Sequence, residues 1–313
     1  MTEDQTQAAQ PLVSILIPTH NRPDYFELAL SSALAQTYPA IEIIVSDNSD
    51  DEATHERIAP YLAKHPNIRY SRVPGYTALE NFHHCFDLAQ GDYVNYLCDD
   101  DLFHPAKIST MMAYLLAHPN VGLVTSVRQL IDHNGHLMAA APPFERVFEI
   151  PTLINGLSLG HSLLTKAGSI IGEPTTTLFR RADLKEKPGM FCGKQYTTLF
   201  DTAMWLTLLS HKDCVYLPEP LSYFRIHASQ DQRQRPTWIR GSIDGIQLFC
   251  EAYEHTQFIA HTPAMHEQLT TLLTNFMSNI WAMNEDFKSG AYPTELARIH
   301  AVIQQATAIL LAR

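Results

Sequence analysis

The sequence has few cysteines and few basic residues. Its five cysteines are odd in number and scattered, with no CxxC pair, which argues against a disulfide framework or a cysteine zinc site and favours reduced, intracellular thiols. Its 22 lysines and arginines are outnumbered by 33 aspartates and glutamates, for a formal net charge of -11. Binding to the phosphates of a nucleic acid needs a basic stripe, and because none is present we expect no nucleic-acid partner.

Long apolar runs are also absent. No window approaches the roughly 18 uninterrupted apolar residues that a membrane-spanning helix needs, and the first ten residues are polar, unlike a signal peptide. Hydrophobic residues make up 45% of the chain and charged residues 18%, which is ordinary globular composition. The 313 residues can bury one large core with an appendage, or two modest domains. We expect a cytoplasmic protein that is at most peripheral at a membrane.

Short apolar runs alternate with longer amphipathic stretches in the first part of the chain. The apolar runs cover residues 12–17, 41–46, 67–73, 93–98 and 121–126, and the amphipathic stretches cover 24–36, 51–64, 79–89 and 105–117. Near-continuous apolar strands that alternate with helices predict an α/β fold, in which a mostly parallel sheet is covered by helices on both faces. The first strand is expected to stop at Pro18.

The pattern is less regular after residue 129 and purely helical after Pro236. The expected elements in between are a turn at Asn134–Gly135, a helix over 152–164, a strand over 175–179, a helix over 201–210 and short strands around residues 215 and 223. Beyond Pro236, apolar residues recur at helical spacing, and the sequence predicts an α-helical C-terminal segment.

Three polar segments follow predicted strands directly, at 18–22, 47–49 and 99–101. In open parallel sheets, ligands bind outside the carboxyl ends of the strands, where such segments lie. Asp99-Asp100-Asp101 is the sharpest of them, because three adjacent carboxylates repel one another unless a cation compensates. Their hard oxygens suit Mg²⁺ or Mn²⁺ that holds a substrate diphosphate. The alternative is a solvated turn whose last aspartate caps the next helix.

The segment from Leu12 to Ser126 resembles the catalytic domain of family-two glycosyltransferases, which have the Rossmann-like type-A glycosyltransferase fold. The matching pieces, in order, are residues 13–22, 31–38, 42–49, Asn81, 89–94 and 99–101. Their order and spacing carry the resemblance more than any single piece. It implies an inverting enzyme that moves a sugar from a nucleotide-diphosphate donor, most commonly UDP, to an acceptor hydroxyl.

The resemblance also implies a role for each matched donor-side position. Pro18, Thr19 and Asn21 would line the pocket for the base and ribose, and Asn81 would join them in binding the nucleotide sugar. Asp47 would accept a hydrogen bond from the nucleobase, and its alternative is an Asx-turn or a helix cap ahead of residue 51.

The aspartate triple would serve as the DxD motif of the family. Asp99 and Asp101 would then face the ribose and the metal ion, Mn²⁺ or Mg²⁺, one each. Asp100 also fits as a metal contact, so the sequence leaves open which of the three carboxylates binds the metal, and Asp100 is assigned to nucleotide-sugar binding.

The second half of the chain carries further matches. Asp201 resembles the catalytic base that would take the acceptor's proton, although Phe200 stands where the family usually has another acid. The alternative is that Asp201 only caps its helix. His227 ends a strand-and-loop match and would complete the metal site or donate to the diphosphate.

Other basic and polar segments of this half have looser matches. Arg225 or Arg233 could oppose the phosphates, and the sequence does not choose between them. Residues 228–235 would form a loop that closes over the donor, and residues 172–181 would lie beside the acceptor or form an ordinary turn and strand.

These matches predict a catalytic domain over residues 11–235, with a nucleotide-binding half up to 126 and an acceptor-binding half from 127, and a helical region over 236–313. The acceptor would be a saccharide, a lipid-linked molecule or a protein, in bacterial-type polysaccharide or glycoconjugate synthesis. The C-terminal helices would form a homodimer or bind a partner. One rival is a catalytically inactive scaffold that binds through those helices. Another is a nucleotidyltransferase, although residues 18–22 lack its glycine-rich basic loop.

Overall fold

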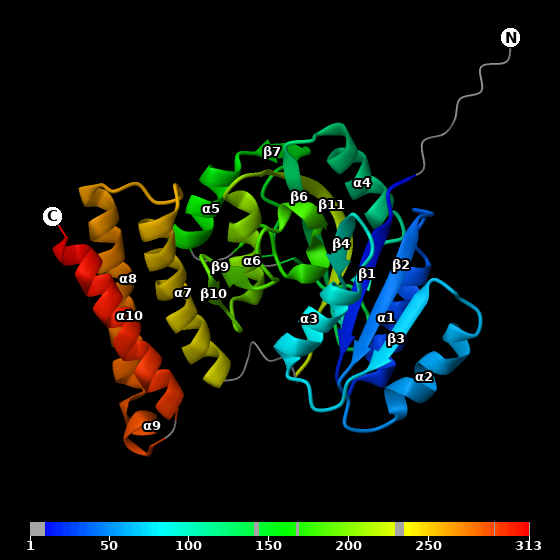
Figure 1. Ribbon diagram of the computed structural model, residues 1–313, viewed down its shortest axis with the longest axis horizontal. Coiled ribbons are helices and arrows are strands. Elements are labelled where there is room, and N and C mark those ends of the chain that lie inside the picture. The colour runs from blue at the N-terminus through cyan, green and yellow to red at the C-terminus, as the bar shows by residue number, and fades with distance from the viewer. Residues whose placement is uncertain (1–9, 141–143, 167–168, 229–234, 291, 313) are drawn as a thin grey trace, which may run out of the picture. The chain divides into compact units, whose positions relative to one another are not determined.

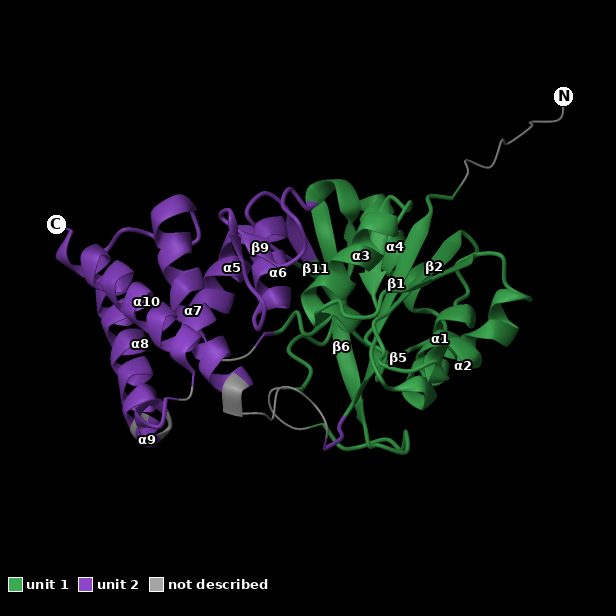
Figure 2. Cartoon of the chain, turned by 60° about the horizontal axis from the view of Figure 1, so that its bottom comes forward, with its two compact units in different colours: residues 1–153, 170–183, 215–225 green, residues 154–169, 184–214, 226–313 purple. Residues whose placement is uncertain are grey.

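The computed structural model describes residues 10–140, 144–166, 169–228, 235–290 and 292–312 (Figure 1). The chain forms two units, shown in different colours in Figure 2. Unit 1 holds the residues up to 153 with 170–183 and 215–225, and unit 2 holds 154–169, 184–214 and the residues from 226 onward. The units are groups of residues in mutual contact. The expected division into a catalytic domain over 11–235 and a helical region beyond it stays a prediction.

Unit 1 is built on the predicted parallel sheet. Its first four strands are β1 (Val13–Thr19), β2 (Ile41–Asp47), β3 (Ile68–Arg72) and β4 (Tyr93–Tyr96). They lie in the order β3-β2-β1-β4, and each neighbouring pair is parallel. The helices between them are α1 (Pro23–Leu34), α2 (Ala53–Leu62) and α3 (Ala78–Leu88), followed by α4 (Lys107–Ala117). The α/β interpretation of the sequence is therefore confirmed.

The other side of the sheet is more mixed. Beyond β4 the order continues through β8 (Leu178–Arg180), β6 (Val121–Ile131), β11 (Asp213–Arg225) and β5 (Leu102–Phe103), and β7 (Thr152–Ile154) pairs with β11. β8 is antiparallel to both β4 and β6. The fifth predicted strand, β6, therefore points the same way as β4 but is separated from it by a strand that comes later in the chain.

Two predicted strand boundaries are wrong. The strand expected over 175–179 starts only at Leu178, because Pro174–Thr176 form a 3₁₀ turn (η1) before it. β1 does not stop at Pro18 but continues to Thr19, opposite Asp47 of β2. The amide of Leu97 donates to the carbonyl of Leu16, so Leu16 faces β4. Pro18, two residues later, faces the same side, but β4 has already ended there, and no partner is present for the N–H that proline lacks. A proline there breaks no ladder hydrogen bond.

Helices cover both faces of this sheet. Alternate β1 residues Val13, Ile15 and Ile17 pack in one core with residues of α1, α2 and α4 such as Phe26 and Met111. On the opposite face α3 packs on β1 and β2, and Cys85 donates its thiol hydrogen to the carbonyl of Ile44. The alternation of side chains along a strand accounts for this division.

Unit 2 is mainly helical. Its elements are α5 (Gly156–Thr165), β9 (Met190–Phe191), β10 (Lys194–Gln195), α6 (Phe200–Leu209), α7 (Arg235–His255), α8 (Pro263–Ala282), α9 (Asn284–Lys288) and α10 (Pro293–Leu311). The predicted C-terminal helices are thus present, and α10 packs on α7 and α8. The helix expected from residue 152 starts at Gly156, because Asn155 caps it by accepting from the amide of Ser158 at 3.1 Å. Among the described residues, none of the helices has the length and apolar composition to span a bilayer.

Candidate functional site

The strand order of unit 1 brings the ends of β1 and β4 together. From β1 the chain continues to β2 on one side, whereas β4 lies on the other side, which makes this edge a topological switch point. The hydroxyl of Thr19 donates to Asp99 Oδ2 at 2.9 Å, and the amide of His20 donates to the same oxygen at 3.2 Å. The polar segments predicted at 18–22 and 99–101 are therefore in direct contact.

Arg22 joins two carboxylates of the aspartate triple. Its Nη1 lies 3.2 Å from Asp99 Oδ1 and 3.2 Å from Asp100 Oδ2. Arg22 belongs to the matching segment 13–22 and was assigned no role from the sequence. The signal was a basic side chain directly after a strand end, opposite a run of three acids.

Asp101 is buried and is held by residues far away in the chain. Thr175 donates its hydroxyl to Asp101 Oδ2 at 2.7 Å, and the amide of Arg225 donates to Oδ1 at 3.0 Å. The same Thr175 oxygen accepts from the amide of Cys98 at 3.1 Å. One hydroxyl thus connects the residue before the triple with the last aspartate of the triple. Thr175 lies in the segment 172–181 that was matched to the acceptor side, and its contact with Asp101 was not predicted.

The turn that carries Thr175 is itself held by buried polar groups. Asn95 donates its amide to the carbonyls of Pro174 at 3.3 Å and Thr175 at 3.4 Å. Lys107 of α4 is fully buried and donates its amine to the carbonyl of Thr176 at 2.9 Å. Burial lowers the pKa of Lys107 well below its usual value, because the charged amine loses its hydration. The position of Asp101 thus depends on a small buried polar network.

Three asparagines and Asp50 connect the loops beside Thr19. Asn81 of α3 donates to the carbonyl of Thr19 at 3.3 Å and to Asn48 Oδ1 at 2.9 Å, and its own Oδ1 is buried without a hydrogen-bond partner among the described residues. Asn21 adopts a left-handed φ of 54°. Its side-chain oxygen accepts from the amide of Asp50 at 2.9 Å, which ties the loop after β1 to the loop after β2.

Asp47 is completely buried at the end of β2. Its Oδ1 accepts from the amide of Ser49 at 2.9 Å, which is the Asx-turn foreseen as the alternative to nucleobase binding. Its Oδ2 accepts from the hydroxyl of Tyr70 at 2.7 Å. Burial, and then this hydrogen bond, raise the pKa of Tyr70, so the phenol keeps its proton.

Burial disfavours the ionised form of two carboxylates of the triple, Asp99 and Asp101. Burial, and then the neighbouring Asp100, raise the pKa of Asp99 to about 6, against the opposing effect of Arg22. Burial, Asp100 and Glu173 raise the pKa of Asp101 well above its usual value. A divalent cation beside these carboxylates would lower their pKa values again. Carboxylate oxygens are the ligands that Mg²⁺ and Mn²⁺ prefer. By its chemistry the donor set fits such an ion, although no group of three or more His, Cys, Asp or Glu side chains in the described ranges is gathered around one point.

The side chain of Arg225 binds backbone carbonyl groups. It is buried, its Nε donates to the carbonyl of Asp100 at 2.7 Å, and its Nη1 lies 3.2 Å from the carbonyl of Asp132. Its guanidinium stacks 4.7 Å from the ring centre of Tyr25. These contacts hold the backbone of the aspartate triple, which is a different role from the phosphate contact considered from the sequence. The other candidate, Arg233, lies outside the described residues.

Asp201 and His227 belong to unit 2, whereas the aspartate triple belongs to unit 1. The cap position of α6 is Leu199, so Asp201 lies in the first turn, and the alternative that it caps the helix is wrong. Buried Asp244 of α7 holds the chain just before the helix, since its Oδ2 accepts from the amides of Thr198 at 3.2 Å and Leu199 at 3.1 Å. Asp201 Oδ1 accepts from the amide of Thr202 at 2.7 Å.

His227 is buried and follows two residues after Arg225, whose amide bonds Asp101. Its predicted role as a metal ligand stays a prediction. Of the segment 228–235 expected to close over the donor, residues 229–234 lie outside the described part of the chain.

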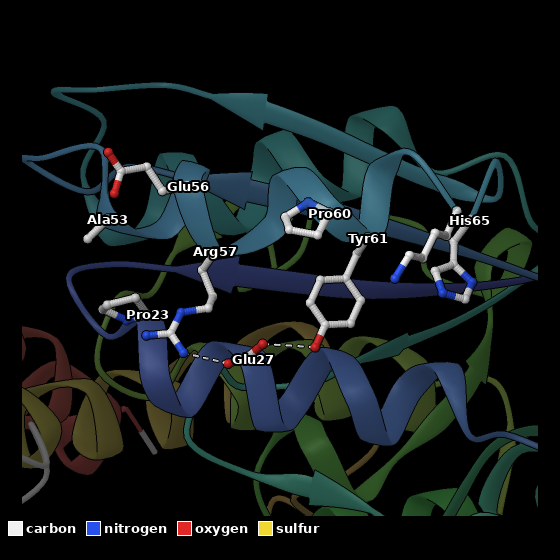
Figure 3. Close-up of a pocket in the computed structure, with 9 residues that line it drawn as sticks. Pro23, Glu27, Ala53, Glu56, Arg57, Pro60, Tyr61 and His65 are labelled. Carbon is white, nitrogen blue, oxygen red and sulfur yellow. Dashed lines mark hydrogen bonds and ion pairs between the residues drawn. The ribbon is translucent and has the colours of Figure 1, made fainter.

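Unit 1 also contains a cavity of about 520 Å³ between α1 and α2 (Figure 3). Among its lining residues, Glu27 accepts from Arg57 at 2.6 Å and from Tyr61 at 2.9 Å. These hydrogen bonds, that of Arg57 first, lower the pKa of Glu27. None of its lining residues belongs to the strand ends, so we assign no part of the candidate site to this cavity.

Comparison with known proteins places this arrangement in a family. The family model described as glycosyl transferase family 2 matches residues 14–186. An uncharacterised glycosyltransferase of Rickettsia prowazekii is 32% identical over 224 residues, which cover 70% of this chain and 65% of that relative, so the chain spans a little under two thirds of its length.

Two solved structures share the fold. Staphylococcus aureus TarS 1–349 in complex with UDP-GlcNAc is similar at a TM-score of 0.61 and 15% identity, over 96% of this chain and 81% of that one. The mannosyltransferase PcManGT of Pyrobaculum calidifontis, in complex with GDP-Man and Mn²⁺, gives 0.58 and 15%, over 97% and 88%. At these identities the likeness establishes the type-A glycosyltransferase fold alone.

Proposed function

Because the chain belongs to glycosyl transferase family 2, we propose that it transfers a sugar from a nucleotide-diphosphate donor to an acceptor hydroxyl, with UDP as the favoured nucleotide. The observation that carries the proposal is the hydrogen bond from Thr19 to Asp99, which joins the ends of β1 and β4 at the switch point of the sheet. Proteins of the same fold that hold UDP-GlcNAc and GDP-Man support a nucleotide-sugar donor.

On the donor side, the loops after β1 and β2 would receive the nucleoside. Pro18, Thr19 and Asn21 would line the pocket, and the buried Oδ1 of Asn81 would accept a hydrogen bond from the ligand. Asp47 already accepts from Ser49 and Tyr70. Each carboxylate oxygen has a second lone pair, so Asp47 would accept a further hydrogen bond from the nucleobase once the loops that bury it move apart.

Asp99 and Asp101, with His227, would hold Mn²⁺ or Mg²⁺, and Asp100 would stay on the nucleotide-sugar side. When bound, the cation would neutralise charge on the leaving diphosphate. The raised pKa values of Asp99 and Asp101 support this, since a buried group of like charges is stabilised by a cation. The complex of PcManGT with Mn²⁺ is consistent with it.

On the acceptor side, Asp201 would act as the general base. It would take the proton of the acceptor hydroxyl while that oxygen forms a bond to the anomeric carbon and the bond to the diphosphate breaks, which inverts the configuration. Phe200 stands in place of a second acid and packs against Gly189. A Cβ added at Gly189 would lie 2.3 Å from the ring of Phe200, so the ring occupies the space beside the glycine. One carboxylate is enough to accept one proton.

The wider setting is also a proposal. Residues 11–235 would form the catalytic domain, and residues 236–313 would form a homodimer or bind a partner. The acceptor would be a saccharide, a lipid-linked molecule or a protein, and the enzyme would work in the cytoplasm, peripherally at the membrane, in polysaccharide or glycoconjugate synthesis.

A thermal-shift screen tests the donor site. UDP, GDP and dTDP would each be added with and without Mn²⁺, and we expect one of them, with the metal, to raise the melting temperature, because a ligand that binds only the folded state stabilises it. If no nucleotide shifts the melting temperature under either condition, the scaffold alternative is favoured.

Product analysis then tests the reaction. With sugar donors of the nucleotide that binds, cleavage of the sugar–oxygen bond and an inverted anomeric configuration by NMR would support the proposal. Cleavage of a phosphorus–oxygen bond would instead identify a nucleotidyltransferase.

A further inference from the structure

Unit 2 contains a cavity of about 290 Å³ at the junction of α5, the start of α6, α7 and α8. Its wall is mainly apolar and includes Leu163, Leu164, Leu199, Ile246, Leu272 and Phe276. The volume is about twice that of the roughly 150 Å³ apolar cavity that accepts a benzene molecule in an engineered protein. It therefore suits an apolar group of one or two rings, or a short alkyl chain.

The apolar wall is left accessible to a ligand. Leu163, Leu164, Leu199 and Leu272 are only half-buried, so apolar surface remains exposed in a concave place. Concave apolar surface with a few polar groups is the usual composition of a small-molecule site. Asn275 and Asn279 line the same cavity, lie one turn apart on α8 and are exposed. These amides suit the hydroxyl groups of a ligand. Lys166, which is exposed, also lines the cavity and is its charged member.

The cavity lies beside the proposed catalytic base. Thr202 lines it, and the amide of Thr202 donates to Asp201 Oδ1 at 2.7 Å. The hydroxyl of Thr202 lies 3.3 Å from the same oxygen. A molecule anchored in the cavity is thus one residue away from the carboxylate that would deprotonate an acceptor.

Gly245 of α7 keeps the cavity open. A Cβ built at this position would meet only Leu199 Cδ1, at 4.0 Å, so a larger side chain would have room to extend into the cavity. Glycine in the middle of a helix lowers stability relative to alanine. The open space is therefore maintained at a position where a side chain would stabilise the helix.

We propose that this cavity binds the apolar aglycone of an acceptor glycoside, with Asn275 and Asn279 facing its sugar hydroxyls. The proposal rests on the proposed function, because it identifies the class of the acceptor and places it next to Asp201. It narrows the three acceptor classes to glycosides that carry an alkyl, aryl or isoprenoid group, and it distinguishes them from free saccharides.

The test compares two probes that differ only in the aglycone. Binding of n-octyl β-D-glucoside, below its micelle-forming concentration, and of methyl β-D-glucoside would be measured by calorimetry on the full chain. We expect the octyl glycoside to bind at least about tenfold more tightly, because burying two or more methylenes already gives this ratio. Equal affinities for the two glycosides would overturn the proposal.

Two leucine substitutions on α7 localise the binding. Gly245→Leu should remove the octyl preference by filling the cavity. Gly241→Leu is the matched control, since Gly241 lies one turn earlier, is not among the lining residues, and its added Cβ would meet only Thr198 Cγ2, at 3.4 Å. An octyl preference that persists in Gly245→Leu would overturn the proposal. If Gly245→Leu does not fold, as judged by circular dichroism, Leu272→Gln makes the wall polar and should reduce the preference by at least about threefold.

The nucleotide screen separates this proposal from the proposed function. A nucleotide-dependent thermal shift without an octyl preference would overturn the aglycone site and leave the transferase intact. An octyl preference that Gly245→Leu removes, in a chain that binds no nucleotide, would support the apolar glycoside site and overturn its role as an acceptor site.

Discussion

The strand ends of unit 1 and the start of α6 in unit 2 hold their carboxylates in different ways. Asp101 receives hydrogen bonds from Thr175 and Arg225, which lie 74 and 124 residues away in the sequence. Asp201 accepts hydrogen bonds from the amide and the hydroxyl of its neighbour Thr202. Asp101 is therefore held by residues that only the folded chain brings to it, whereas Thr202 reaches Asp201 as its neighbour at the helix start. Substitutions in the two regions should have different consequences.

The largest effect is expected from Asp201→Asn. An amide cannot accept the acceptor's proton, so the rate of transfer should fall about 10²–10⁴-fold, the usual contribution of a general base. Because the substitution leaves unit 1 unchanged, the nucleotide-dependent thermal shift should stay as in the wild type. Steady-state kinetics with a saturating donor measure the rate. Unchanged turnover would remove Asp201 from the mechanism and weaken the comparison.

The next effect is expected from Thr175→Val, which preserves the shape of the side chain and removes its hydroxyl. Asp101 Oδ2 and the amide of Cys98 would lose a partner in a buried place, and such losses cost about 1–3 kcal/mol each. We expect the affinity for nucleotide with Mn²⁺ to fall roughly tenfold or more by calorimetry. Thr175→Ser should restore it.

Thr177→Val is the matched control for that experiment. Thr177 is equally buried in the same segment, and its hydroxyl donates to the carbonyl of Pro174 at 3.3 Å, away from the triple. If Thr177→Val weakens nucleotide binding as much as Thr175→Val does, the effect belongs to the turn as a whole and not to the Asp101 contact.

A smaller, pH-dependent effect is expected at Lys107. Burial lowers its pKa in the folded chain, while the unfolded chain keeps a value near 10.4, so between these values the unfolded state binds more protons. The free energy of unfolding contributed by this group therefore rises with pH, by up to about 1.4 kcal/mol per pH unit. Lys107→Met removes the titrating group.

Urea denaturation at pH 7 and 8.5 measures this contribution. The wild type should gain stability relative to Lys107→Met as the pH rises. Parallel changes in the two proteins would show that Lys107 titrates as an exposed lysine does, and the buried network under Asp101 would then lack its proposed anchor.

The smallest effect is expected from Thr202→Val. The amide of Thr202, which makes the shorter bond to Asp201, remains after the substitution, and only the hydroxyl contact at 3.3 Å is lost. A hydrogen bond of this kind contributes about 0.5–1.5 kcal/mol, so we expect a two- to tenfold decrease in the transfer rate and unchanged nucleotide affinity. A loss as large as that of Asp201→Asn would contradict the expectation that the amide of Thr202 is its more important contact with Asp201.

Much of the fold was accessible from the sequence because it depends on local patterns. Continuous apolar runs identified the strands of the parallel sheet, and amphipathic stretches identified the helices. The insertion of β8 between β4 and β6 was not predicted, since strand order depends on contacts between residues far apart in the chain. The extension of β1 through Pro18 was missed for a related reason: it depends on where the neighbouring strand ends.

The candidate site shows the same division. Asp99, Asp100, Asp101 and Asp201 were named because acidic residues at a strand end or a helix start are visible as motifs. Thr175 was not named, because a threonine among other threonines forms no recognisable motif. Its role depends on the contact with Asp101, which exists only in the folded chain. Lys107, in contrast, can be noticed in the sequence. It lies four residues before Met111 on the apolar face of α4, where a charged side chain is unusual.

The sequence by itself determined the strands, the helices, and which polar segments follow them, because side-chain periodicity and backbone preferences act over a few residues. Tertiary structure alone decided that Arg22 bridges two aspartates, that Thr175 and Arg225 hold the third, and that an apolar cavity opens beside Asp201. Such contacts join segments brought together only when the sheet and the helices pack, and burial then gives each of these polar contacts its energetic weight.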